Sequence, residues 1–290
     1  MDEKDWQLLK TLRDTRNITK AANHLNTSQP GLSKRLQMLE ERFGTNIALR
    51  NKSGIEFTPA GEYLADYASL MLEQLQTVRE RINDMGAEIK GTLRIGASNY
   101  CISYILPEIL AAFKKMHPLV EFMVTSAWSS DIIKKVGGGE VHVGFIRNDY
   151  AQLPERILLL SEKTFICSTK KIDLASLPDE PQISYKSDPL VTANMNMWWA
   201  EHYKKPPKTA MIVDRLGSCV EMVHNGLGWA FLSEKMTLSM KGIRKYEVKH
   251  PDGKPYIRNT WVIPNSDAKQ LRMVASFIDF IRDYLKHSKI

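Results

Sequence analysis

Apolar residues at helical spacing predict three short helices within residues 1–58. The first helix ends near Arg16, and Thr19 is the expected N-terminal cap of the second. Ser28 caps the third helix, and Gly44 ends it in the conformation that glycine commonly adopts after a helix C-terminus. A stripe of leucines runs along one side of the third helix and marks its buried face.

A small hairpin is predicted next, because residues 47–57 alternate roughly between apolar and polar positions and turn at Ser53-Gly54. Three short helices and a hairpin are typical of a winged helix-turn-helix, which we place at residues 1–58. The polar face of the third helix carries amides and hydroxyls for base edges and a lysine for phosphate. These side chains are Gln29, Ser33, Lys34 and Gln37. The alternative is an ordinary solvated helix face.

One long helix is predicted for residues 59–89, which contain no proline or glycine between Gly61 and Gly86. A mostly apolar seam recurs along it every three to four positions: Tyr63, Tyr67, Leu70, Gln74, Val78, Ile82, Met85 and Ile89. At 1.5 Å per residue, the seam is roughly 40 Å long. A helix cannot bury such a seam alone, so we expect residues 59–90 to form a linker that pairs with a second copy. The alternative is a helix packed on its own domain.

Strands and helices alternate from Gly91 onward, which is typical of a parallel sheet with crossover helices. The predicted strands are residues 92–97, 120–125, 141–146, 164–167, 182–185, 210–213, 229–232 and 261–264. The predicted helices are residues 102–116 (interrupted near Pro107), 131–136, 198–203, 219–225 and 268–284. The alternation breaks near residues 158–163. We therefore predict two α/β lobes with a cleft between them: residues 91–162 with 266–290, and residues 163–265.

Composition and charge narrow the class of protein. Of 290 residues, 43% are hydrophobic and 25% are charged, which is ordinary for a globular protein. We expect a cytoplasmic protein without a membrane partner, because no apolar run approaches the roughly 18 residues that cross a bilayer and the charged N-terminus lacks a secretory signal. The net charge of +7 arises largely in residues 91–290, where 27 basic side chains outnumber 20 acidic ones. This excess is consistent with a small anionic ligand or with scattered surface charge.

Three predicted strands end at groups suited to an anion, and ligands of open α/β sheets bind beyond the carboxyl ends of strands. These groups are Ser98, the pair Ser129-Ser130 and Arg147. The serines precede predicted helices, whose free N–H groups favour an anion, and a guanidinium suits a carboxylate. Arg258 lies late in the second lobe. The alternatives are a helix cap for each serine and a surface ion pair for each arginine.

Other chemistries find less support in the sequence. The histidines lack metal-ligand spacing, and the serines lack a G-x-S-x-G nucleophile motif. Cys101 lies near a predicted helix start, which leaves a redox sensor as an alternative to a small buried cysteine. We therefore expect no catalytic residue, no metal and no cofactor. A solute-binding protein and an α/β enzyme are the competing interpretations of the two lobes.

The N-terminal region resembles the signature of LysR-type transcriptional regulators. The matching positions are Ala21, Ala22, Leu25, Ser28, Gln29, Pro30, Ser33, Leu36, Leu39, Glu40, Phe43, Gly44, Arg50, Thr58, Ala60 and Gly61. Ala48 departs from the pattern, which usually has phenylalanine there. The resemblance implies a DNA-binding head, a linker helix that dimerises, and a two-lobed effector domain like those of periplasmic binding proteins. It also implies a homotetramer on promoter DNA.

The resemblance further implies roles for individual residues. The DNA-contacting residues would be Ser28, Gln29, Pro30, Ser33, Lys34, Gln37 and, on phosphate from the wing, Arg50. The effector-contacting residues would be Ser98, Ser129, Ser130, Arg147 and Arg258. Stretches such as Ala127-Trp128-Ser129-Ser130 and Trp198-Trp199 are similar to the citrate-responsive branch of the family, which controls tricarboxylic-acid-cycle genes. The implied effector is a small polycarboxylate, citrate first, and a different anion or a redox signal is the alternative.

Overall fold

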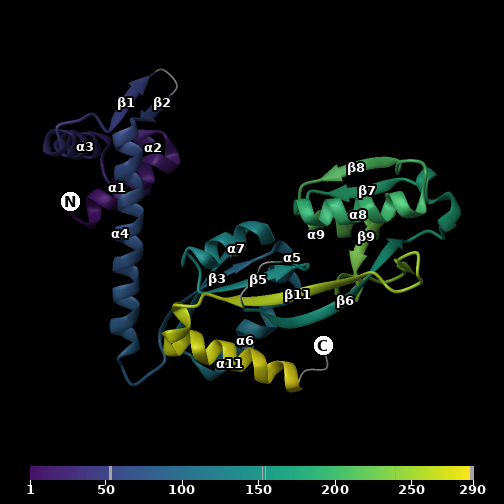
Figure 1. Cartoon of the computed structure of the whole chain (residues 1–290). Coiled ribbons are helices and arrows are strands. Elements are labelled where there is room, and N and C mark those ends of the chain that lie inside the picture. Colours follow the sequence, from purple (N-terminus) through teal and green to yellow (C-terminus); the bar gives the residue numbers. More distant parts are fainter. Residues whose placement is uncertain (52–53, 152, 154, 239, 288–290) are drawn as a thin grey trace. The chain divides into compact units, whose positions relative to one another are not determined.

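The computed structural model describes most of the chain: residues 1–51, 54–151, 153, 155–238 and 240–287. The chain divides into two compact units, Met1–Met85 and Gly86–Ile290, which we describe one at a time (Figure 1). Among the described residues, no helix is both long enough and apolar enough to cross a membrane.

Three helices open the first unit: α1 (Glu3–Thr15), α2 (Ile18–His24) and α3 (Gln29–Phe43). As predicted, the Ser28 side chain caps α3, and Gly44 ends that helix with a left-handed backbone. The predicted cap of α2 is wrong. Asn17, not Thr19, caps this helix, because the Asn17 side-chain oxygen accepts a backbone N–H of the first turn.

An antiparallel hairpin follows α3 and consists of β1 (Ala48–Asn51) and β2 (Gly54–Phe57). It confirms the predicted wing, although Ser53 of the predicted turn lies outside the described residues. Ala48 pairs with Phe57 and packs, partly buried, against the core of the unit.

The core of the first unit joins the three helices, the wing and the start of α4 (Pro59–Asp84). Its largest side chains are Leu8, Leu9, Leu12, Leu32, Leu36, Leu39, Ile47, Ile55 and Phe57. Gly61 lies where α4 crosses the chain leading into the wing. A Cβ at that position would overlap the carbonyl oxygen of Ile47, so only glycine fits there without a shift of the backbone.

The long helix α4 ends at Asp84, earlier than the predicted end at Ile89. Gly86 disfavours a longer helix, and Ile89 packs on the core of the second unit instead of extending the seam. An ion pair between Arg13 and Asp66 holds α1 against α4. The remainder of the seam is exposed in the single chain: Tyr63, Tyr67, Leu70, Val78, Ile82 and Met85.

The second unit contains a seven-stranded sheet with the strand order β10-β6-β11-β5-β3-β4 and with β9 beside β6. Lobe I contains the parallel strands β3 (Gly91–Ala97), β4 (Val120–Ser126) and β5 (Val143–Arg147). Its helices are α5 (Asn99–Tyr104), α6 (Leu106–Met116), α7 (Ser129–Gly137) and α11 (Arg272–His287). The parallel strands with crossover helices confirm the predicted fold. The predicted interruption of helix 102–116 is also confirmed, and it lies at Ile105, two residues before Pro107.

Two long strands connect the lobes: β6 (Ile157–Ser168) and β11 (Ile257–Pro264), which pair antiparallel (Figure 1). The predicted break at residues 158–163 is wrong, because β6 runs through it without interruption. The stretch resembles a break because Glu162, a charged residue, occupies a buried position in it. Beyond this residue, β6 leaves the sheet of lobe I and pairs with β9 and β10.

Lobe II contains the helices and strands drawn in green in Figure 1. Its elements are η1 (Leu174–Asp179), β7 (Gln182–Tyr185), α8 (Pro189–His202), β8 (Thr209–Val213), α9 (Leu216–His224), β9 (Ala230–Ser233), α10 (Glu234–Thr237) and β10 (Arg244–Glu247). Trp198, Trp199 and Trp229 pack together in its core. This tryptophan cluster is separate from the larger core of the second unit, which contains residues of both lobes.

Candidate functional sites

A cleft lies between the lobes of the second unit and is lined by residues of both. The empty space between its lining residues is about 530 Å³, a volume that includes open solvent. Four of the five predicted effector residues line it: Ser98, Ser129, Arg147 and Arg258. The fifth, Ser130, lies beside it and donates its backbone N–H to Asp188, which is a lining residue.

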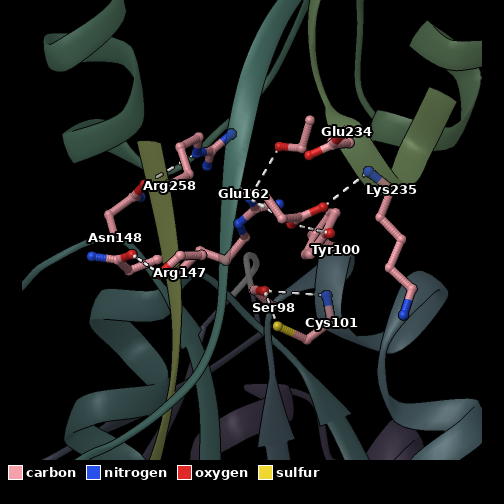
Figure 2. Close-up of polar contacts among 12 residues, drawn as sticks. Ser98, Tyr100, Cys101, Arg147, Asn148, Glu162, Glu234, Lys235 and Arg258 are labelled. Carbon is pink, nitrogen blue, oxygen red and sulfur yellow. Dashed lines mark hydrogen bonds and ion pairs between the residues drawn. The ribbon is translucent and has the colours of Figure 1, made fainter. Parts of the chain in front are cut away.

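Arg147 ends β5 and is buried, with 2% of its surface exposed. Its Nη2 donates to Glu162 Oε2 at 3.1 Å and to Ser233 Oγ at 3.0 Å, and its guanidinium carbon lies 3.6 Å from the centre of the Tyr100 ring (Figure 2). Its Nε and Nη1 are also buried and have no hydrogen-bond partner among the described residues. Because unpartnered buried donors are costly, these groups favour an acceptor in the cleft.

The electrostatics of Arg147 also favour an anion in the cleft. Burial, together with the neighbouring charge of Arg258, lowers the pKa of Arg147 from its ordinary value. Arginine keeps its proton in proteins, so the positive charge is present and incompletely compensated, although Glu162 already faces it. An additional anion in this part of the cleft would therefore be stabilised.

Glu162 is a central residue of the site that sequence reasoning missed. Its Oε2 accepts hydrogen bonds from Arg147 and from the Tyr100 hydroxyl, and its Oε1 accepts the N–H of Lys235 at 2.9 Å (Figure 2). Tyr100 belongs to lobe I and Lys235 to lobe II, so one carboxylate on the crossing strand contacts both. Burial, with the charge of Glu162, raises the pKa of Tyr100 and keeps its hydroxyl a donor. The only sign of this role in the sequence was a single glutamate within the strand at residues 157–168.

The side chains of two of the three predicted serines already have partners in the protein. Ser98 caps α5, where its Oγ accepts the N–H of Cys101 at 3.4 Å. Ser129 is buried, and its Oγ accepts the N–H of Arg147 at 3.1 Å. The helix-cap alternative therefore describes Ser98, whereas Ser129 fixes the backbone that carries Arg147.

Arg258 reaches the cleft from β11 and is partly buried. Its Nε donates to Asn148 Oδ1 at 3.1 Å. Asn148 Nδ2 is buried and, among the described residues, has no hydrogen-bond partner. Arg147, Asn148 and Arg258 thus gather several N–H donors in one part of the cleft, which is the arrangement that a carboxylate requires.

The cysteines offer little to a redox mechanism. Burial raises the pKa of Cys101 to about 11 and the pKa values of Cys167 and Cys219 to about 12. Because the thiolate is the reactive form, all three thiols are poorly reactive at neutral pH.

A second polar surface lies on the first unit, between α3 and the wing. The groove there contains six of the seven predicted DNA-contacting residues: Gln29, Pro30, Ser33, Lys34, Gln37 and Arg50. Ser33 Oγ accepts hydrogen bonds from Gln29 Nε2 and from Arg50 Nη2, each at 3.0 Å, so the wing arginine is tied to α3. Ser28 is the cap of α3 and not a groove residue.

A winged helix-turn-helix, a long helix with an exposed apolar seam and a two-lobed domain with a polar cleft together define the architecture of a DNA-binding regulator. Residues 4–62 match the model of the bacterial regulatory helix-turn-helix proteins of the lysR family, and residues 86–286 match the LysR substrate binding domain. The chain belongs to the LysR family and is a DNA-binding transcriptional regulator, not an enzyme.

Comparison with individual proteins agrees with this assignment. The chain is 37% identical to the uncharacterized HTH-type transcriptional regulator YraN of Bacillus subtilis (strain 168), over 97% of this chain and 98% of that one. It is 29% identical to YkuM, also an uncharacterized HTH-type transcriptional regulator of that organism, over 98% of each chain. The fold is similar to that of full-length CbnR crystallised with its target DNA, with a TM-score of 0.68, 20% identity and coverage of 98% and 99%.

Proposed function

We propose that this regulator binds a small carboxylate, citrate first, in the cleft between its lobes, and that the ligand changes how the protein engages promoter DNA. The observation that carries the proposal is the buried guanidinium of Arg147, whose Nε and Nη1 have no partner among the described residues. The buried amide of Asn148 and the guanidinium of Arg258 lie in the same cleft. A carboxylate accepts several N–H groups at once and supplies the charge that this set lacks.

Citrate is the first candidate because stretches lining the cleft resemble the citrate-responsive branch of the family. The cleft residues Ala127, Trp128 and Ser129 belong to one of these stretches. On the same basis, we propose tricarboxylic-acid-cycle genes as targets. The named relatives YraN and YkuM carry no effector in their names, so the choice of citrate rests on the cleft and these stretches alone.

A ligand in the cleft contacts both lobes, because residues of both lobes line the cleft. Arg147 donates directly to Ser233 of lobe II and is also linked through Glu162 to Lys235 at the start of α10, so a ligand on Arg147 is one side chain away from lobe II. The lobes are joined by two strands, an arrangement that permits rotation of one lobe against the other. The ligand shifts this equilibrium by its preference for one arrangement.

We also propose which residues contact DNA and how the chains assemble. We assign base contacts to Gln29, Pro30 and Ser33 and phosphate contacts to Lys34 and Arg50, since all five line one groove. The exposed seam of α4 pairs with the same helix of a second chain, because such an apolar surface is costly in water. Two such dimers form a tetramer on the promoter, and CbnR supplies a precedent for a full-length family member on its target DNA.

Calorimetry with citrate tests the effector assignment. We expect the full chain to bind citrate, and Arg258→Ala to weaken binding roughly 10- to 150-fold through loss of a charge-assisted contact. Arg244→Ala is the matched control, since Arg244 is exposed on β10 and does not line the cleft. No heat at millimolar citrate with the wild-type chain would refute citrate as effector, and equal binding by both variants would place the ligand elsewhere.

A further inference from the structure

Asp188 joins the first turns of two helices that belong to opposite lobes. It precedes α8 in lobe II, where its Oδ1 accepts the N–H of Leu190 at 3.0 Å. Its Oδ2 accepts the N–H of Ser130, in the first turn of α7 in lobe I, at 3.3 Å. The side chain is 8% exposed, so a buried carboxylate bridges the two sides of the cleft.

The first turn of α7 is a place where an anion is stabilised. Trp128 occupies the N-cap position and makes no side-chain hydrogen bond to the helix, so α7 depends on another group for an acceptor. Backbone N–H groups and the helix dipole favour negative charge there. In this structure, Asp188 supplies that charge from the opposite lobe.

The remainder of the cleft indicates that a ligand anion reaches the same region. Arg147 Nε and Nη1 and Asn148 Nδ2 are donors on buried side chains, and they have no partner among the described residues. All of these residues line the cleft together with Ser129 and Asp188. A ligand held by Arg147 through one carboxylate would therefore lie close to the helix start that Asp188 occupies.

We propose that Asp188 is a resident carboxylate that competes with a carboxylate of the effector for the first turn of α7. The proposal rests on the carboxylate-binding function of the cleft given above. A ligand with one carboxylate satisfies Arg147 and leaves Asp188 in place. A ligand with two or more displaces Asp188 and frees lobe II from α7. Asp188 thereby sets the number of carboxylates that an effector needs.

Asp188→Asn tests this competition. Asparagine is as good a helix cap as aspartate, so α8 keeps its cap, while the negative charge and the acceptor facing Ser130 are lost. Citrate titrated into the full-length variant should bind roughly 2- to 30-fold more tightly than to wild type, which is the range for a single charge at a helix N-terminus. Asp179→Asn is the control, because Asp179 and its ion-pair partner Lys205 are both exposed and neither lines the cleft. It should bind citrate as wild type does.

Amide hydrogen exchange of the ligand-free proteins provides a second measurement. Exchange in the first turn of α7 should be faster in Asp188→Asn than in wild type or Asp179→Asn, because the variant lacks the acceptor for Ser130. Unchanged exchange would overturn the proposed contact regardless of calorimetry. Citrate binding by wild type without tightening in Asp188→Asn would overturn the competition alone. If no protein binds citrate, the effector assignment fails, and the competition for citrate fails with it.

Discussion

The buried ion pair between Arg147 and Glu162 yields the sharpest stability prediction. In Glu162→Gln, the side chain keeps its size and one acceptor oxygen but loses the charge that faces Arg147. The Arg147 charge then remains buried without its counter-ion, and the second contact of the same carboxylate, to the Tyr100 hydroxyl, is also perturbed.

The burial of both partners sets the magnitude. The side chains of Arg147 and Glu162 are 3% and 4% exposed, and the Nη2–Oε2 distance is 3.1 Å. Removing one partner of a buried pair typically costs about 3–5 kcal/mol, because the remaining charge cannot regain water. We therefore expect Glu162→Gln to lower the free energy of unfolding of the second unit by about that amount.

Urea unfolding followed by tryptophan fluorescence measures this loss. Five of the six tryptophans lie in the second unit, so the signal reports mainly on it. Asp214→Asn removes the ion pair with Lys186, whose side chains are 77% and 67% exposed, and should leave the midpoint essentially unchanged. A loss below about 1 kcal/mol for Glu162→Gln would refute the buried charge network described here.

Three further predictions concern other parts of the chain. Lys34→Ala should weaken promoter binding and lower the slope of log affinity against log salt by about one, as the loss of a phosphate contact does. Lys10→Ala, on the exposed side of α1, should change neither. Equal slopes for the two variants in titrations followed by anisotropy would exclude a phosphate contact by Lys34. Gly61→Ala should destabilise the first unit by about 1–3 kcal/mol in thermal unfolding, because the added Cβ would overlap the carbonyl of Ile47. Gly217→Ala is the control and should not destabilise the protein, because Gly217 has open space around it. A Gly61→Ala variant of wild-type stability would contradict the close crossing. Burial lowers the pKa of His142 to about 3, and its Nδ1 accepts the N–H of Arg94, so the ring is neutral in the folded state. The free energy of unfolding should therefore fall as the pH drops from about 6.5 toward 3, by up to about 1.4 kcal/mol per pH unit. His142→Gln should flatten this slope in urea titrations, and an unchanged slope would contradict the role of His142.

Local sequence patterns predicted the elements that depend on local physics. The start of α3 after Ser28 and the apolar strands of lobe I were predicted correctly. A helix cap and an apolar period both depend only on residues that are close together in the sequence. The α2 cap was misplaced because Asn17 and Thr19 are both good caps, and only the position of Ile18 in the helix decides between them. The end of α4 was misplaced because Ile89 continues the apolar period but packs on a different core.

The cleft could be predicted only in part, because its chemistry depends on partners distant in sequence. The positions of Ser98, Ser129 and Arg147 followed from strand ends, and the structure places them together in one cleft. Glu162 and Asp188 did not follow, because a buried carboxylate is recognisable only once its donors are known. For Glu162 these donors are Arg147, Tyr100 and Lys235, and they lie up to 73 residues away.

The most direct test of an effector-responsive regulator is a footprint on the DNA upstream of the chain's own gene, with and without millimolar citrate. We expect the wild-type protein to protect this DNA and citrate to alter the extent or the affinity of protection, while the Arg258→Ala protein binds the same DNA but responds only at much higher citrate. Protection by wild type that citrate leaves unchanged at every concentration would contradict citrate as the effector, and absence of any protection would contradict the assignment of this DNA as a target.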